Sequence, residues 1–386
     1  MPLALLALTI GAFAIGTTEF VIVGLVPTIA EQLAISLPSA GLLVSIYALG
    51  VAIGAPVLTA LTGRMPRKQL LLALMVLFTA GNLLAWQAPG YGTLIVARLL
   101  TGLAHGVFFS IGSTIATSLV PKEKAASAIA IMFGGLTVAL VTGVPFGTFI
   151  GQHFGWRETF LAVSILGVIA LISSLILVPN NIPGRAGASL RDQLKVLTHP
   201  RLLMIYAITA LGYGGVFTAF TFLAPMMQEL AGFSPSAVSW ILLGYGISVA
   251  IGNVWGGKLA DKHGAVAALK FIFAALVVLL LVFQFTVLVM GIFAFGNVPG
   301  LQVYVVQKAE QYTPGAVDVA SGLNIAAFNI GIALGSVIGG QTVELYGLAQ
   351  TPWIGALIVL VALLLVVLSG RLDKSPRRSA AVSLEG

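Results

Sequence analysis

The chain has 386 residues, of which 59% are hydrophobic and 8% are charged, and its formal net charge is +7. Soluble domains carry about 45–50% apolar and about 25% charged residues, so this composition excludes an ordinary soluble protein and indicates a membrane protein. Cysteine is absent, which excludes disulfides, thiolate catalysis and cysteine-based zinc sites.

Apolar segments follow one another along the chain, each long enough to cross a hydrocarbon core of about 30 Å. The first has no basic region before it and continues through Glu19 to Pro27, so we expect a spanning helix and not a cleaved signal peptide. Breaks at glycine, proline and charged residues predict twelve segments: 3–26, 38–61, 69–87, 92–119, 125–151, 157–178, 201–228, 236–257, 267–284, 286–306, 316–343 and 350–370.

Basic residues concentrate on every second loop between these segments. All lysines and arginines except Arg98 and Arg157 lie there or in the C-terminal tail. Cytoplasmic loops of membrane proteins carry this excess. We therefore expect a multi-pass membrane protein with both termini in the cytoplasm. The positive charge then reflects this bias and contact with anionic lipid, not nucleic-acid binding.

The two halves of the chain repeat each other. Segments 125–151 and 316–343 both contain a GxxxGxxxG pattern, which places small residues on one helix face and lets two backbones approach closely. A parallel six-plus-six repeat is typical of transporters that bind substrate between their halves, near the membrane midplane. We therefore predict a bundle over residues 1–178, a cytoplasmic linker over 179–200, a second bundle over 201–371 and a tail over 372–386.

Five short motifs resemble those of the major facilitator superfamily, and more narrowly its drug:proton antiporter branch, which includes arabinose-efflux-permease and sugar-efflux transporters. The resemblance covers nearly the whole chain. The motifs are Gly257-Lys258-Leu259-Ala260-Asp261-Lys262-His263-Gly264, Arg98-Leu99-Leu100-Thr101-Gly102, Gly143-Val144-Pro145-Phe146-Gly147, Trp156-Arg157 and Gly16-Thr17-Thr18-Glu19-Phe20.

This resemblance implies an all-α membrane protein whose twelve helices form two six-helix bundles related by pseudo-two-fold symmetry. It also implies a secondary active transporter that exports small organic solutes, either sugars or amphipathic drugs, in exchange for protons. Such a transporter works without a cofactor and usually as a monomer, and its partners are its solute, protons and the lipid bilayer.

The resemblance further implies a cytoplasmic gating network, for which the matching residues are Arg64, Arg67, Asp261 and Lys262. Gly63 stands where the family usually has an acidic residue, so we expect the network to depend on Asp261.

The ninth and tenth segments are unusually close together. Only 37 residues separate Lys270 from Lys308, whereas two full spans need about 40 residues before any turn. The possible turn at 284–286 has no glycine, proline or asparagine. Either both helices are short, or one is irregular, or residues have been lost from this part of the chain.

Three ionisable residues, Glu19, Arg98 and His105, lie inside predicted spans. A charged side chain at midbilayer costs about 2.5–3.5 kcal/mol on insertion scales, so such groups usually face a cavity or a partner. Glu19 and Arg98 fall at comparable depth, and His105 lies two turns beyond Arg98 on the same helix face. We interpret the three as a proton-coupling group, with His105 as a second carrier. The alternative is a permanent Glu19–Arg98 pair beside a neutral histidine.

Candidate substrate contacts are less specific. Asn324 and Asn329 in the eleventh segment can donate and accept hydrogen bonds, although interhelical bonding is an equally ordinary use of asparagine. Phe20, Phe109 and Phe217 are candidates for lining a cavity, although such rings more often face lipid or neighbouring helices.

Other functions fit less well. A proton-independent facilitator or uptake carrier stays open, as does a non-transporting or defective copy, because of the short 271–307 stretch. An intramembrane enzyme lacks a nucleophile–base pair, and the four histidines have no metal-ligand spacing. The segment 252–258 matches GxxxxGK, but Leu259 replaces the serine or threonine that a nucleotide site requires.

Overall fold

The computed structural model describes residues 3–58, 61–62, 65–121, 125–182 and 196–374. Every regular element within these ranges is helical. Eleven of the helices described there are long and apolar enough to cross a membrane, and a twelfth, α13, is apolar but shorter. The predicted all-α fold with twelve membrane segments is therefore confirmed.

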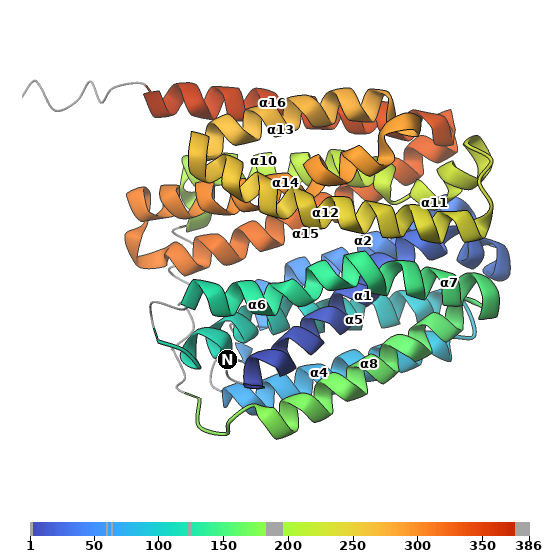
Figure 1. Ribbon diagram of the computed structural model, residues 1–386, viewed down its shortest axis with the longest axis horizontal. Helices are drawn as coiled ribbons and strands as arrows, with labels where there is room; N and C mark the ends of the chain where they lie inside the picture. Colours follow the sequence, from blue (N-terminus) through green and yellow to red (C-terminus); the bar gives the residue numbers. More distant parts are fainter. Residues whose placement is uncertain (1–2, 59–60, 63–64, 122–124, 183–195, 375–386) are drawn as a thin grey trace, which may run out of the picture.

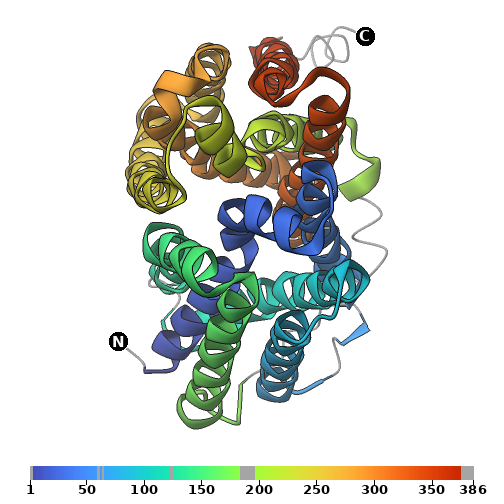
Figure 2. The ribbon, with the colours of Figure 1, turned by 90° about the vertical axis from the view of Figure 1, so that its right-hand side faces the viewer.

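The helices lie side by side along the long axis of the molecule, and the view along them shows two groups (Figures 1 and 2). We call the first group the N-terminal bundle. It consists of α1 (Leu3–Leu33), α2 (Leu37–Ile53), η1 (Gly54–Leu58), α4 (Arg67–Trp86), α5 (Tyr91–Ser118), α6 (Ala125–Val138), η3 (Ala139–Gly143), α7 (Val144–Phe154) and α8 (Trp156–Leu177).

We call the second group the C-terminal bundle. It consists of α10 (Pro200–Phe220), α11 (Leu223–Pro225), η4 (Met226–Leu230), α12 (Pro235–His263), α13 (Ala265–Leu281), α14 (Phe283–Tyr312), η5 (Pro314–Ala316), α15 (Val317–Tyr346), η6 (Leu348–Gln350) and α16 (Thr351–Lys374). The spanning helix α16 runs beyond 370, so the predicted end of the last segment was too early.

Successive spans run in opposite directions, which puts Leu3 and Lys374 at one end of the molecule. We call this end the terminal end and the other the opposite end. The turns between spans use ordinary helix signals. Ser36 and Ser234 cap α2 and α12 by accepting hydrogen bonds from the backbone N–H groups of Ser39 and Ala237. Gly347, with φ of 89°, ends α15 in a backbone conformation that a side chain would strain.

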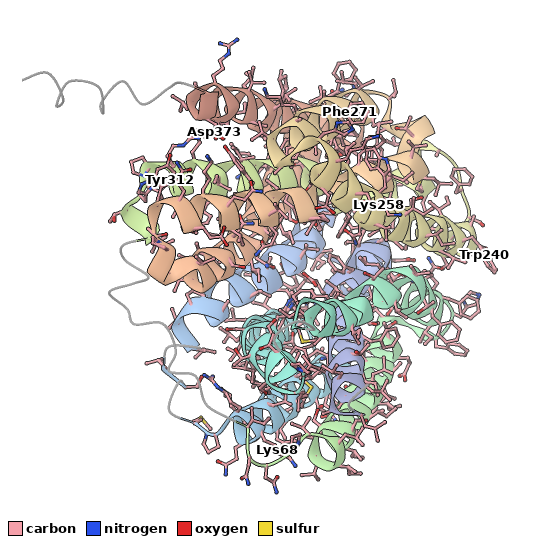
Figure 3. All side chains as sticks on the ribbon, turned by 60° about the vertical axis from the view of Figure 1, so that its left-hand side comes forward. Lys68, Trp240, Lys258, Phe271, Tyr312 and Asp373 are labelled. Carbon is pink, nitrogen blue, oxygen red and sulfur yellow. The ribbon has the colours of Figure 1, made fainter. Side chains whose placement is uncertain are left out.

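The outer surface of the helices is apolar, as a lipid-facing surface must be. Trp240 is 73% exposed at the opposite end, and Phe271 is 56% exposed on α13 (Figure 3). Trp353 and Tyr346 are also exposed near the opposite end. Tryptophan and tyrosine gather where a membrane meets water, so these rings mark the opposite-end boundary of the bilayer.

Each of the two glycine patterns lets one span pack closely on another span of the same bundle. In the first, a Cβ on Gly143, Gly147 or Gly151 would meet α1 at Thr17, Val21 or Leu25. In the second, a Cβ on Gly331, Gly335 or Gly339 would meet α10 at Ala210, Gly214 or Thr218. The fifth span thus packs on the first as the eleventh packs on the seventh, with four-residue steps on both partners. This correspondence supports the internal repeat that the sequence suggested.

The short stretch is explained by one helix. Helix α13 has 17 residues and ends at Leu281; Val282 alone connects it to α14, which has 30 residues. The predicted turn at 284–286 was therefore wrong by a few residues, because no glycine or proline marks Val282. At a rise of 1.5 Å per residue α13 is about 25 Å long, somewhat less than a hydrocarbon core. The tenth span is complete.

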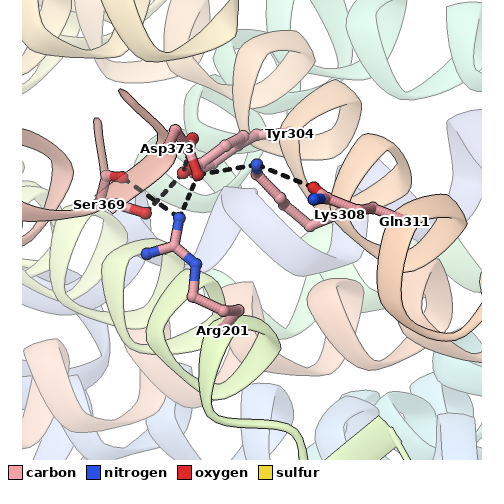
Figure 4. Close-up of polar contacts among 6 residues, drawn as sticks. All are labelled: Arg201, Tyr304, Lys308, Gln311, Ser369 and Asp373. Atoms are coloured by element: carbon pink, nitrogen blue, oxygen red, sulfur yellow. Dashed lines mark hydrogen bonds and ion pairs between the residues drawn. The ribbon is translucent and has the colours of Figure 1, made fainter. Parts of the chain in front are cut away.

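A polar cluster ties three spans of the C-terminal bundle together at the terminal end (Figure 4). The Asp373 carboxylate at the end of α16 accepts hydrogen bonds from Lys308 at 2.7 Å and from Tyr304 at 2.9 Å, both on α14. It also binds Arg201 of α10, which donates a further hydrogen bond to the carbonyl oxygen of Ser369. One carboxylate thereby holds the ends of α10, α14 and α16 in a fixed arrangement.

The two bundles meet along two seams. In the seam between α2 and α15, the Ser45 hydroxyl donates to the carbonyl oxygen of Ala333 at 2.9 Å. In the seam between α7 and α12, the Ser239 hydroxyl donates to the Gln152 side chain at 3.1 Å. Ser239 lies one turn inside the opposite end, so this end of the molecule is held closed.

Three of the residues predicted for the gate, Arg67, Asp261 and Lys262, lie at the terminal end. Asp261 and Lys262 are exposed in the last turn of α12, and no ion pair joins either to another described residue. Arg67 is buried at the start of α4. Arg64 lies outside the described residues. The gating network therefore stays a prediction.

The glycine packing predicts a stability effect. In Gly335→Ala the new Cβ would overlap the carbonyl oxygen of Gly214, and such overpacking typically costs about 1–3 kcal/mol. We expect the thermal unfolding midpoint of the detergent-purified protein to fall by several degrees. Gly322→Ala on the same helix is the control, because nothing lies within 4 Å of its Cβ position. Equal midpoints for the two variants would contradict the proposed close approach of α10 and α15.

Candidate functional site

The three ionisable residues predicted from the sequence lie in one buried cluster between α1, α2 and α5. Glu19 is 8% exposed, Arg98 is 1% exposed and His105 is 5% exposed. The Nδ1 atom of His105 lies 3.9 Å from the Oε2 atom of Glu19. The expected juxtaposition of the first and fourth spans is therefore present.

A fourth member of the cluster, Tyr47 on α2, was not predicted. Its hydroxyl lies 3.0 Å from the Nδ1 atom of His105, and its ring lies under the Arg98 guanidinium, 4.2 Å from centroid to Cζ. A single tyrosine in an apolar segment gives no sequence signal for such a role. Its position lets it connect the histidine with the guanidinium.

Arg98 binds backbone and not the Glu19 carboxylate. Its Nη1 and Nη2 atoms donate to the carbonyl oxygens of Thr18 and Glu19 at 2.7 and 3.4 Å, and its Nε atom donates to the carbonyl oxygen of Leu43 at 3.2 Å. One side chain on α5 thus fastens both α1 and α2. The permanent Glu19–Arg98 side-chain pair considered from the sequence is not the arrangement found here.

The backbone around Glu19 is also held from α4. The Thr18 hydroxyl donates to the Asn82 side-chain oxygen at 2.7 Å, and the Asn82 amide donates to the carbonyl oxygen of Phe78 at 2.9 Å. Both Thr18 and Asn82 are buried. The segment that carries Glu19 therefore has a fixed position in the bundle, whereas its carboxylate makes no hydrogen bond with a described residue and has His105 at 3.9 Å.

The electrostatics of the cluster depend on one proton. With Glu19 ionised, its charge balances that of Arg98, and with Glu19 protonated the cluster carries one net positive charge. Charges in a dry interior interact far more strongly than in water. Gain or loss of that proton therefore changes the electrostatic energy of the neighbouring groups strongly.

The predicted aromatic residues divide into two places. Phe109 lies inside the N-terminal bundle, where its ring centroid is 4.9 Å from that of His105. Phe20, next to Glu19, instead faces the C-terminal bundle, with centroids 6.4 Å from Phe217 and 6.0 Å from Phe295. Phe20 and Phe217 therefore lie at the contact between the bundles, as expected for residues near a central site.

The two asparagines differ in their bonding. Asn324 accepts a hydrogen bond from the Thr209 hydroxyl at 2.7 Å and donates one to the Gln302 side chain at 2.9 Å. Asn329 donates only to the carbonyl oxygen of Ile325 on its own helix, and its buried side-chain oxygen has no partner. Asn329 thus retains a free acceptor, whereas Asn324 joins three helices.

No group of three histidine, cysteine or acidic residues among the described parts of the chain could hold a metal ion. What the geometry of the cluster supports chemically is the binding and release of a proton at Glu19, with His105 next to it.

The Arg98 contacts predict the effect of replacing the guanidinium. Arg98→Lys keeps the charge, but one ammonium cannot reach three carbonyl oxygens on two helices. Hydrogen bonds to charged groups contribute about 1.5–3 kcal/mol each, so we expect a large fall in the thermal unfolding midpoint. Arg371→Lys is the control, because Arg371 is exposed. A midpoint unchanged in both variants would contradict the fastening role of Arg98.

Comparison with known proteins gives the family. The family model described as Major Facilitator Superfamily matches residues 8–317. The chain is 54% identical over 387 residues to an uncharacterized MFS-type transporter, YtbD, of Bacillus subtilis (strain 168), with 98% of each chain covered. It is 43% identical over 380 residues to the inner membrane transport protein YdhP of Escherichia coli (strain K12), covering 95% of this chain and 96% of the relative.

Among solved structures, the nucleoside transporter NupG has a TM-score of 0.78 at 14% sequence identity, with 95% of this chain and 99% of that chain covered. At this identity the likeness shows the fold alone. The family model and the two relatives, which are transport proteins and not enzymes, agree with the twelve-helix fold. The chain belongs to the major facilitator superfamily and is a multi-pass membrane transporter.

Proposed function

We propose that this transporter belongs to the drug:proton antiporter branch and exports small organic solutes, either sugars or amphipathic drugs, in exchange for protons. The observation that supports this most is the position of Glu19. It is a buried carboxylate beside a histidine, and the next residue of the same helix, Phe20, contacts the other bundle. Proton binding and bundle movement can therefore act on the same few residues.

In the proposed cycle Glu19 carries the proton and His105 is its neighbour in the relay. The hydroxyl of Tyr47 lies within hydrogen-bond distance of His105 and orients the imidazole. Arg98 opposes protonation of Glu19 by its charge while it holds the backbone of Thr18 and Glu19 in place. These roles require no cofactor.

The solute would bind between the bundles at the same depth. Phe20 and Phe217 offer apolar surface from either side, and the free side-chain oxygen of Asn329 offers an acceptor for a hydroxyl or amine. Phe109 borders the site from behind His105. The two hydrogen bonds that Asn324 makes to Thr209 and Gln302 favour a supporting role for this residue over direct contact.

We propose that the terminal end faces the cytoplasm of a bacterial inner membrane, because the basic loops lie there. The described conformation is closed at the opposite end, where Gln152 and Ser239 meet. The gate at the terminal end, with Arg64, Arg67, Asp261 and Lys262, would close when the opposite end opens. We further propose that the transporter works as a monomer. Its two bundles, residues 1–178 and 201–371, are joined by a cytoplasmic linker over 179–200.

Two alternatives are disfavoured for stated reasons. A proton-independent carrier would have no use for a carboxylate and a histidine buried side by side. A defective copy was suggested by the short 271–307 stretch. The shortening falls on α13, whereas α14, which carries Phe295 at the bundle contact, has 30 residues.

The proposal predicts the behaviour of Glu19→Gln in proteoliposomes. The added solute is ethidium as the amphipathic probe or L-arabinose as the sugar probe. Its addition should drive protons out of proteoliposomes that contain the wild type and not out of those that contain the variant. Glu310→Gln, an exposed acid near the end of α14, is the matched control and should behave as wild type. The measurement is the fluorescence of a trapped pH indicator.

Proton release that persists in Glu19→Gln would remove Glu19 as the carrier and direct attention to His105. Solute movement without any proton release in the wild type would support the facilitator instead.

A further inference from the structure

Two oxygen-bearing side chains face the same nitrogen of His105. The Tyr47 hydroxyl lies 3.0 Å from the Nδ1 atom, within hydrogen-bond distance, whereas the Oε2 atom of Glu19 lies 3.9 Å from it, beyond that distance. The imidazole also packs against the rings of Tyr47 and Phe109, with centroids 5.7 and 4.9 Å away. In the conformation described here the tyrosine, and not the carboxylate, therefore binds Nδ1.

The burial of Tyr47 indicates which atom supplies the proton of this hydrogen bond. Tyr47 is 1% exposed, and His105 is the one described residue with which its hydroxyl makes a hydrogen bond. A hydroxyl that only accepted would leave its own buried proton without a partner, which is costly. The Tyr47 O–H therefore donates, and Nδ1 accepts with its lone pair. The single N–H of a neutral imidazole is then on Nε2.

The distance to Glu19 agrees with this assignment in both protonation states of the carboxyl group. With Glu19 ionised, a proton on Nδ1 would be drawn to the carboxylate, because hydrogen bonds to charged groups are shorter and about twice as strong as neutral ones. With Glu19 protonated, its O–H would donate to Nδ1 if the lone pair were free. Neither bond is present at 3.9 Å. A charged imidazole would also add a second positive charge to a buried cluster that already holds Arg98.

We propose that Tyr47 is a positioning residue that holds His105 as a neutral imidazole with its proton on Nε2. Tyr47 thereby keeps Nδ1 unavailable to the Glu19 proton in this conformation. Transfer to His105 would break the O–H bond of protonated Glu19 and form an Nδ1–H bond, leaving a carboxylate and an imidazolium. That step needs the lone pair to which Tyr47 donates.

The relay from Glu19 to His105 therefore waits for a conformation in which the imidazole has turned away from Tyr47. This consequence rests on the proposed antiport function, whereas the position of the proton on His105 does not. The two can accordingly be tested apart.

The test is the nitrogen-15 NMR spectrum of the detergent-purified protein with labelled histidine at neutral pH, in which the two ring nitrogens report which of them carries a proton. The His105 signals are those lost in His105→Asn. We expect the wild type to show a protonated Nε2 and an unprotonated Nδ1. In Tyr47→Phe, which keeps the ring under Arg98, the freed Nδ1 should share a proton with Glu19, so its signal should shift to that of a protonated nitrogen.

Two further variants serve as controls. Tyr245→Phe also removes a buried hydroxyl, but its ring is stacked on Phe220 in the C-terminal bundle, so both His105 signals should stay in place. Glu19→Gln should also leave Nδ1 unprotonated, because Tyr47 and not Glu19 determines which nitrogen carries the proton.

A protonated Nδ1 in the wild type would overturn the inference, and this spectrum decides even if Tyr47→Phe fails to fold. An Nδ1 that stays unprotonated in folded Tyr47→Phe, or becomes protonated in Glu19→Gln or Tyr245→Phe, would also overturn it. If the spectra are as expected but the wild type releases no protons on addition of solute, the antiport proposal alone is wrong. If protons are released but Nδ1 is protonated in the wild type, the inference alone is wrong.

Discussion

A buried guanidinium governs the arrangement of the N-terminal bundle. Arg98 lies where a charge is costly, and its cost is offset by three backbone carbonyl oxygens and by the face of the Tyr47 ring. Because these carbonyl groups belong to α1 and α2, the same contacts fix the position of Glu19 relative to α5. Glu19 itself is left without a permanent partner. The bundle is thus rigid around a carboxylate that no hydrogen bond from a described residue holds, which is what the proposed exchange requires.

The two bundles are tightly packed inside, and they also meet each other closely. Glycine patterns bring α1 against the fifth span and α10 against the eleventh. The Asp373 cluster joins α10, α14 and α16 at the terminal end. Between the bundles, two serine hydrogen bonds and the contacts of Phe20 with Phe217 and Phe295 add to close backbone packing, in which a Cβ on Gly246 would meet Leu140. Movement of one bundle against the other therefore has to break these contacts.

Sequence patterns could predict three features. Hydropathy predicted the twelve spans, glycine spacing predicted the internal repeat, and charged residues at membrane depth predicted that Glu19 lies near His105. The partners of Arg98 could not be predicted, since a sequence does not show which backbone carbonyl groups a side chain will reach. The turn at Val282 has no glycine or proline to mark it. Tyr47 and His105 are 58 residues apart in the sequence, and Arg201 and Asp373 are 172 apart. Such contacts emerge only from the packing of helices.

If the two bundles rock during transport, the closed opposite end must open. A Cβ on Gly340 would lie 3.3 Å from the Cβ of Pro38 across the seam between α2 and α15, close to the separation of about 3.5–4.5 Å found in disulfides. Because the chain has no cysteine, the variant Pro38→Cys with Gly340→Cys has one possible disulfide. We predict that oxidation stops solute-driven proton release and that a reductant restores it. Undiminished proton release from the fully cross-linked protein would contradict the account.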